Sequence, residues 1–129
     1  MKNLFSLQNK TALITRASSG MGKAIAFAMG LHGAKIVVSS NDAVGLFKTV
    51  EEFRSENIEA IGVECDMSNK ADIDRLFQQT IKTFGQIDIL VNCVGMAPTG
   101  TFLNINQENF GKTMDLNIQA AIYLTQLVI

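Results

Sequence analysis

Residues 10–33 constrain the fold of this chain more than any other stretch. They read KTALITRASSGMGKAIAFAMGLHG, with a short apolar run at 12–15, a polar turn containing Gly20 and Gly22, and then a helical pattern. This order places the backbone N–H groups of a turn at a helix N-terminus, which carries about half a unit of positive charge. Glycine suits the turn because a Cβ would keep a phosphate away and crowd the helix against the strand. The stretch therefore predicts a site for a phosphate-bearing ligand.

The rest of the chain repeats this alternation of strand and helix. Apolar, β-branched runs at residues 34–40, 58–64 and 87–92 predict three further strands. Strands of this kind, continuous rather than alternating, are typical of a parallel sheet that is covered by helices on both faces. We therefore expect a doubly wound α/β fold with right-handed crossovers and the usual strand order 3-2-1-4.

Helical spacing of apolar residues predicts the helices and the apolar face of each. The predicted faces are Ala24, Ile25, Ala28, Met29 and Leu31 in the first helix, Val44, Phe47, Val50 and Phe53 in the second, and Ile73, Leu76, Phe77, Thr80, Ile81 and Phe84 in the third. A short helix is predicted to begin near Asn104 or Asn106, and a last helical run near Met114.

Composition narrows the function classes. The 129 residues carry a net charge of −1 without a block of like charges, which argues against nucleic-acid and membrane-surface binding. No apolar run approaches the roughly 20 residues of a spanning helix, and the first residues lack a secretion or transit signal, so we expect a cytoplasmic protein. Cys65 and Cys93 lack metal-ligand spacing, and the expected strand order separates them by roughly 14 Å, too far for a disulfide. We expect free thiols and no metal site.

Four motifs, in order, resemble those of the short-chain dehydrogenase/reductase family over essentially the whole chain. The family's opening TGxxxGxG is similar to residues 15–22, its Asp after the third strand to Asp66, its NNAG motif to residues 92–95, and its helix Asn to Asn117 in MDLNIQAA. The resemblance implies a Rossmann-type sheet and an NAD(P)(H)-dependent hydride transfer between an alcohol and a carbonyl compound. The residues that it assigns to the cofactor are Thr15, Arg16, Ser18, Ser19, Gly20, Met21, Gly22, Ser40, Asn41, Asp66, Met67, Asn92 and Gly95.

The resemblance also implies individual roles. Gly20 and Gly22 would seat the pyrophosphate, and Asp66 would contact the adenine. Gly95 would let the nicotinamide-side ribose approach, and Asn117 would belong to the catalytic set by organising a proton-relay water. Asn92 either contacts the cofactor or, as in most of the family, ties adjacent strands together through its amide.

The departures from the family pattern are as informative as the matches. Arg16 stands where the family has its first glycine, and if that site needs a positive φ the substitution costs on the order of 1–2 kcal/mol. The Arg16 side chain would lie by the adenosine ribose, where it blocks the cofactor, pairs with a 2′-phosphate or simply points outward. Cys93 and Val94 replace the Asn and Ala of NNAG, so only Asn92 and Gly95 are carried over.

The end of the second strand indicates the cofactor. Relatives that prefer NAD place an acid near the position of Ser40, because a carboxylate accepts from both ribose hydroxyls and repels a 2′-phosphate. Relatives that prefer NADP often place Arg near the position of Asn41. Here Ser40, Asn41 and Arg16 favour NADP(H), whereas Asp42 argues mildly against it. We expect a slight preference for NADP(H) over NAD(H).

The reacting residues that the resemblance implies are a Ser and a Tyr-xxx-Lys pair, in which the Lys lowers the pKa of the Tyr acid/base. The single tyrosine, Tyr123, has Leu127 instead of Lys at that spacing, so it is interpreted as a helix packing residue. The sequence stops at Ile129 inside an apolar helical pattern. We therefore expect residues 1–129 to form one NAD(P)-binding domain that ends before the catalytic segment.

Two classes of function remain open. The first is the cofactor-binding half of an oxidoreductase for a small-molecule alcohol or carbonyl substrate, inactive on its own. The alternative is a non-catalytic nucleotide-binding or partner-binding module. It would form homo-oligomers or join full-length homologues through its last helix and the exposed edge of its fourth strand. A receiver-like signalling domain would need acids at the end of the first strand, and residues 15–18 have none.

Overall fold

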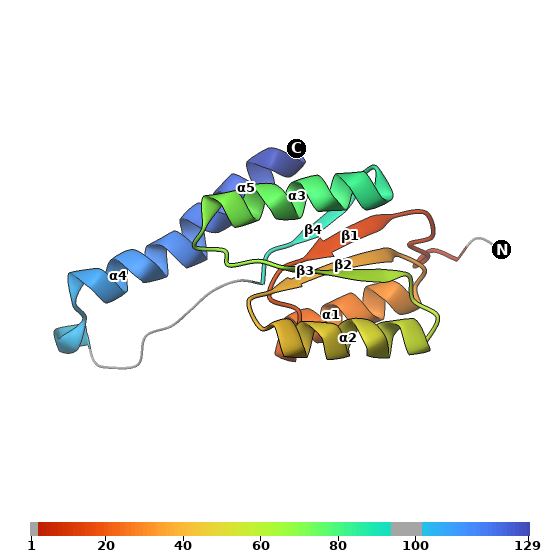
Figure 1. The fold of residues 1–129 in the computed structure, drawn as a ribbon, viewed down its shortest axis with the longest axis horizontal. Helices are drawn as coiled ribbons and strands as arrows, with labels where there is room; N and C mark the ends of the chain where they lie inside the picture. Colours follow the sequence, from red (N-terminus) through yellow and green to blue (C-terminus); the bar gives the residue numbers. More distant parts are fainter. Residues whose placement is uncertain (1–2, 94–101) are drawn as a thin grey trace.

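Four short strands form one parallel sheet in the computed structural model, which describes residues 3–93 and 102–129. In sheet order they are β3 (Ala60–Glu64), β2 (Lys35–Ser40), β1 (Thr11–Ile14) and β4 (Ile89–Val91) (Figure 1). Leu13 of β1 is in register with Val37 of β2 on one side and Leu90 of β4 on the other. The predicted strand order and the doubly wound parallel sheet are confirmed.

Helices cover both faces of this sheet. The helical elements of the described residues are α1 (Gly20–Leu31), α2 (Ala43–Ser55), α3 (Lys70–Phe84), the 3₁₀ turn η1 (Phe102–Asn104), α4 (Gln107–Met114), the π-helical turn η2 (Asp115–Gln119) and α5 (Ala120–Val128). Figure 1 shows α1 and α2 below the sheet and α3 and α5 above it, while α4 projects beyond the carboxyl ends of the strands. None of the residues of α4 is buried.

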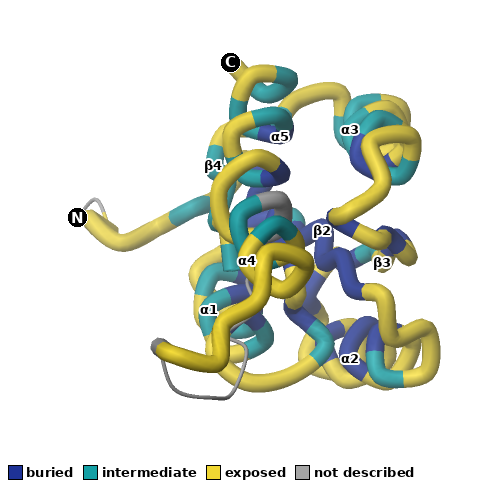
Figure 2. The backbone as a smooth tube through the Cα atoms, turned by 90° about the vertical axis from the view of Figure 1, so that its left-hand side faces the viewer, coloured by how far each residue is buried: buried dark blue, intermediate teal, exposed yellow. Residues whose placement is uncertain are grey.

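Alternation along β1 divides the core into two clusters. Ala12 and Ile14 pack on the side of α1 and α2, in a cluster that includes Phe53. Leu13 packs on the opposite side with Leu76 of α3 and Leu124 of α5. Because successive side chains of a strand point to opposite faces, a four-residue strand contributes to both layers. Figure 2 shows this buried interior between helices whose outer surfaces are exposed.

The predicted apolar face of α1 is mostly wrong, since only Ile25 and Met29 of it are half-buried. Ala24, Ala28 and Leu31 are exposed, and the helix instead buries Gly22, Ala26 and Gly30 at intervals of four residues. A Cβ built on Gly30 would lie 2.6 Å from a side-chain carbon of Ile58, so the helix approaches its neighbours too closely for any larger residue. The smallest side chains therefore face the sheet, and this close packing brings the helix N-terminus near the strand ends.

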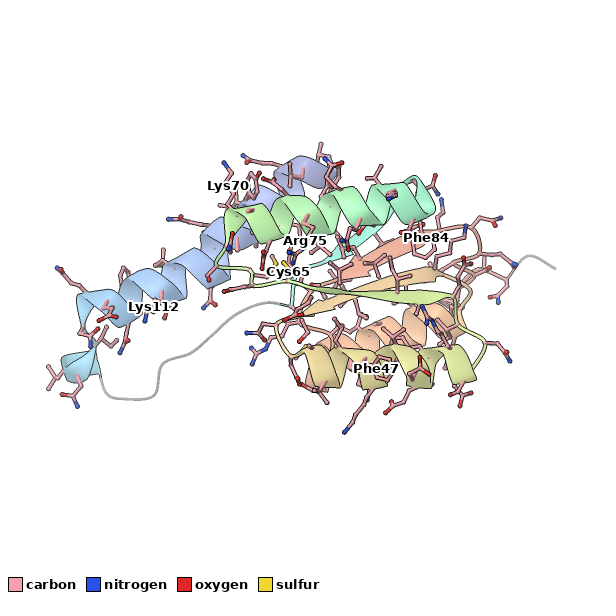
Figure 3. All side chains as sticks on the ribbon, in the orientation of Figure 1. Phe47, Cys65, Lys70, Arg75, Phe84 and Lys112 are labelled. Atoms are coloured by element: carbon pink, nitrogen blue, oxygen red, sulfur yellow. The ribbon has the colours of Figure 1, made fainter. Side chains whose placement is uncertain are left out.

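The predicted apolar face of α2 is half wrong. Val50 and Phe53 are buried as expected, but Val44 and Phe47 are exposed and Leu46 is buried in their place. Figure 3 shows Phe47 pointing away from the sheet. The helix carries two interleaved apolar patterns, and the sequence alone does not distinguish which of them meets the sheet. The third helix buries Ile73, Leu76 and Thr80 of its predicted face.

Candidate functional site

The N-terminus of α1 is open, unlike the N-termini of the two helices that follow. Asp42 accepts a hydrogen bond from the first turn of α2, and Asn69 accepts two from the first turn of α3. Ser19, at the same position of α1, makes no such side-chain bond. The backbone N–H groups of this turn therefore stay available to an anion, and the helix dipole favours negative charge there.

The two glycines of the turn have different roles. Gly20 has a φ of 61°, and a Cβ built on it would meet nothing within 4 Å. Gly22 is buried, and its Cβ would lie 2.6 Å from the carbonyl oxygen of Arg16. Gly20 therefore provides a left-handed turn beside open space, and Gly22 lets the helix pack on the turn. A cradle that a Cβ would disturb, at an uncapped helix N-terminus, fits a pyrophosphate.

Arg16 adopts a φ of 50°, so it occupies a left-handed position that favours glycine. Its side chain is exposed at the carboxyl end of β1. Next to it, the backbone N–H of Ala17 donates to the carbonyl of Ser39 at 3.0 Å, which joins the turn to β2. The positive φ that the glycine pattern implied for position 16 is present.

Two hydroxyls meet between this turn and the end of β2. The Oγ atoms of Ser18 and Ser40 lie 2.8 Å apart, and Ser40 Oγ also accepts from the backbone N–H of Asp42 at 3.1 Å. When two hydroxyls share one hydrogen bond, one of their two protons stays available to a ligand. The carboxylate of Asp42 accepts from Gly45 N–H at 3.1 Å and so caps α2. The acid that argued for NAD is thus engaged in its own helix.

The loop after β3 fixes the carboxylate of Asp66. Both the hydroxyl and the backbone N–H of Ser68 donate to Asp66 Oδ1, at 2.6 and 2.9 Å. The hydroxyl bond first, and then the backbone bond, lower the pKa of Asp66 below its ordinary value, so this carboxylate is charged at neutral pH. The backbone N–H of Asp66 donates to Asp72 on α3 at 2.9 Å. Oδ2 of Asp66 remains for a donor such as an exocyclic amine.

Comparison with known proteins decides the family. Residues 10–129 match the sequence profile described as short chain dehydrogenase. The chain belongs to the short-chain dehydrogenase family.

Three relatives show how the chain aligns within it. It is 38% identical over 122 residues to subunit BbsD of (2S)-[(R)-hydroxy(phenyl)methyl]succinyl-CoA dehydrogenase from Thauera aromatica, which covers 95% of this chain and 49% of the relative. It is 31% identical over 115 residues to the (S)-acetoin-forming diacetyl reductase of Staphylococcus epidermidis, 89% of this chain and 45% of the relative. The structure of hydroxysteroid dehydrogenase from Escherichia coli superposes with a TM-score of 0.92 at 31% identity, over 96% of this chain and 52% of that one. The chain spans about half the length of these relatives.

The amide of Asn92 contacts the last helix in the described part of the chain. Its amide donates to Thr125 Oγ1 of α5 at 3.3 Å. Thr15 joins β1 to the end of β4, because its Oγ1 accepts from Cys93 N–H at 3.0 Å and donates to the Val91 carbonyl at 3.4 Å. In this short-chain dehydrogenase a buried threonine hydroxyl thus links the carboxyl ends of β1 and β4.

The remaining predicted site residues are distributed as follows. Met21 lies exposed in the first turn of α1 and Asn41 lies exposed after β2, whereas the side chain of Met67 is buried in the cluster around Leu76. Asn117 is exposed on η2, between the projecting α4 and the packed α5. Gly95 lies outside the described residues. The parallel strands thus bring together the predicted residues that follow β1, β2 and β3, at the carboxyl ends of these strands.

The sequence did not predict the residues whose hydrogen bonds hold these loops at the carboxyl ends of the strands. Ser68 and Asp72 orient Asp66, and Thr49 of α2 donates to the carbonyl of Ser18 at 3.1 Å. The spacing of Asp66 and Ser68 is a signal for a local side-chain turn. Thr49 carries no comparable signal, because its partner is 31 residues away.

The contacts of Cys65 and Tyr123 indicate that both are packing residues. Both cysteines are free thiols, as predicted, and burial raises the pKa of Cys65 to about 12. Figure 3 places Cys65 between the sheet and α3. The Tyr123 hydroxyl donates to Asp74 and the Lys70 ammonium lies 4.7 Å from its ring centre. The bond to Asp74 is the main cause that raises the pKa of Tyr123, which holds it as a neutral phenol packed on α3.

The described residues offer neither a metal-binding cluster nor a membrane-spanning helix. Residues 3–93 and 102–129 contain no cluster of three or more His, Cys, Asp or Glu side chains suited to a metal ion. Within the same ranges, no helix combines the length and the apolar character that crossing a membrane requires.

Proposed function

We propose that this chain is the dinucleotide-binding half of an NAD(P)(H)-dependent oxidoreductase that interconverts an alcohol and a carbonyl compound. The observation that carries the proposal is the uncapped N-terminus of α1 beside Gly20, whose open side faces no protein atom within 4 Å. The names of the relatives, two dehydrogenases and a diacetyl reductase, support the reaction class. A bound nicotinamide dinucleotide would supply the hydride chemistry.

In this proposal the loops at the carboxyl ends of the strands bind different parts of the cofactor. The turn from Ser18 to Gly22 holds the pyrophosphate with backbone N–H groups, and Asp66 accepts from the adenine amine. Gly95 admits the nicotinamide-side ribose, and Asn117 organises a proton-relay water. The 129 residues contain no Tyr-xxx-Lys pair, so we propose that this chain binds the cofactor without turning a substrate over.

We further propose that NADP(H) is preferred over NAD(H). The carboxylate of Asp42 caps α2 through Gly45, so one of its two oxygens is already held by its own helix. The hydroxyl pair of Ser18 and Ser40 offers a proton to a phosphate oxygen instead. Arg16, which is exposed at the end of β1, adds a cation that suits a 2′-phosphate.

Isothermal titration of the chain with NADPH and NADH tests this proposal. We expect both to bind, with the dissociation constant of NADPH about tenfold lower, since a hydrogen bond to a charged group is worth about 1.5–3 kcal/mol. Binding of NADH at equal or higher affinity would contradict the NADP(H) preference alone. Binding of neither would contradict the dinucleotide-binding function.

A second candidate function is that of a partner-binding module, which the exposure of α4 and of the residues just before it favours. None of the residues of α4 is buried, and Leu103, Ile105 and Phe110 of this region are 90%, 53% and 56% exposed. In the described part of the chain β4 pairs only with β1, which leaves its outer edge unpaired. Such surfaces favour association with another chain. Sedimentation analysis should then detect a dimer or larger species at micromolar concentration, and a strict monomer would contradict this candidate.

A further inference from the structure

Thr49 behaves differently from the other hydrogen-bonded threonines in the helices. Thr80, Thr113 and Thr125 each donate from Oγ1 to the carbonyl four residues earlier in their own helix. Thr49 is 0% exposed and donates instead to the carbonyl of Ser18, at 3.1 Å, in the turn between β1 and α1. A buried hydroxyl that leaves its own helix to bond a glycine-rich turn points to a role in that turn.

The bond to Thr49 sets the direction of the peptide group after Ser18. In a trans peptide the carbonyl and the following N–H point in opposite directions. Because the Ser18 carbonyl points at Thr49 of α2, the N–H of Ser19 points away from α2. The Ser19 N–H therefore lies on the outer side of the turn, next to the uncapped N-terminus of α1.

The same bond anchors the hydroxyl pair at the end of β2. Ser18 Oγ lies 2.8 Å from Ser40 Oγ, so a shift of the Ser18 backbone moves this pair. Helix α2 fits closely here, since a Cβ built on Gly45 would lie 3.4 Å from Ser18 Cβ. Thr49 is thus the side chain through which α2 fixes both the phosphate turn and the hydroxyl pair.

We propose that Thr49 is a positioning residue for the cofactor, which holds Ser18 so that the turn accepts the pyrophosphate and the Ser18–Ser40 pair meets the adenosine ribose and its 2′-phosphate. This inference rests on the proposed dinucleotide-binding function. Thr49 contacts no cofactor itself in this arrangement and acts through Ser18.

The test is Thr49→Val, which keeps the side-chain shape and removes the donor. We expect the dissociation constant of NADPH to rise about tenfold, because the Ser18 carbonyl loses its partner, and the NADPH-over-NADH ratio to fall. Thr49→Ser restores the hydroxyl and should bind NADPH within about threefold of the original chain. Hydrogen exchange of the turn amides, without ligand, should be faster in Thr49→Val than in Thr49→Ser.

Thr80→Val is the matched control. Thr80 is also 0% exposed and also donates to a backbone carbonyl, but that carbonyl belongs to Leu76 of its own helix α3. The control loses the same group from the core and should leave NADPH affinity and the selectivity ratio within about twofold of the original chain. Equal weakening by Thr80→Val would mean that the effect is general destabilisation, and would overturn the proposal.

The outcomes separate this inference from the function on which it rests. If the unsubstituted chain binds NADPH and Thr49→Val binds it equally well, the positioning role is wrong and the function stands. Failure of Thr49→Ser to restore binding would also overturn the positioning role. If the unsubstituted chain binds neither dinucleotide, the proposed function fails and this inference falls with it.

Discussion

Gly22→Ala should weaken the binding of NADPH about 100-fold, equivalent to about 2.7 kcal/mol. The added Cβ would lie 2.6 Å from the carbonyl oxygen of Arg16 and 3.3 Å from the Cα of Ala17. Both are backbone atoms, so relief of the overlap requires the turn itself to move away from the helix. The N–H groups that would bind the pyrophosphate then no longer point toward the same position. Isothermal titration measures the loss, and circular dichroism checks that helix content is unchanged.

Gly111→Ala is the control for this substitution. Gly111 also lies in a helix, α4, but a Cβ built on it meets nothing within 4 Å. Alanine is the better helix former by about 1 kcal/mol, so this variant should be as stable as the original chain or slightly more so, with unchanged NADPH affinity. Tight NADPH binding by Gly22→Ala would show that the close contact at position 22 does not shape the site.

The parts of the fold that the sequence predicts are those set by local pattern. Apolar runs of four to seven residues with helical spacing between them specify strands buried on both faces, and the parallel order of β3, β2, β1 and β4 follows. The glycine turn is predictable for the same reason. Gly20 and Gly22 are only two residues apart in the chain, and the left-handed conformation of Gly20 is a local property of the turn.

The buried face of each helix depends on which surfaces pack together, and no local sequence pattern predicts this packing. Helix α1 carries apolar residues around most of its surface, and the face that wins is the one with Gly22, Ala26 and Gly30, because it lets the helix lie closest to the sheet. Hydrophobicity alone ranks Leu31 above glycine, yet Leu31 is 57% exposed. Steric fit at a close helix–sheet contact outweighs the burial of a larger side chain here.

The sequence predicts a hydrogen bond within the candidate site where both partners lie in one local turn, and not where the partner is distant in the chain. The amide of Asn92 reaches Thr125 on α5, and the hydroxyl of Thr49 reaches Ser18 across 31 residues. Their sequence neighbours give no hint of either contact. The Ser68 bonds to Asp66, in contrast, span two residues and are a local turn that the sequence contains.

Arg16→Gly should raise the stability of the chain and lower its affinity for NADPH. Arg16 has a φ of 50°, and relief of this left-handed conformation should raise the free energy of unfolding by about 1 kcal/mol. The lost guanidinium should raise the dissociation constant of NADPH about tenfold, because a hydrogen bond to a charged group contributes about 1.5–3 kcal/mol. NADH, which has no 2′-phosphate, should bind with nearly unchanged affinity. Urea unfolding and isothermal titration measure the two effects.

The matched control is Asn57→Gly, because Asn57 is also exposed and has a φ of 62°. Asn57 lies between α2 and the amino end of β3, whereas Arg16 follows the carboxyl end of β1. The control should leave the affinity for both dinucleotides unchanged. If Arg16→Gly instead strengthens both, the side chain obstructs the cofactor. If it changes neither, Arg16 is only a tolerated surface residue. A selective loss of NADPH, in a chain that has become more stable, has neither explanation: the protein then retains a strained Arg16 because the guanidinium binds the 2′-phosphate.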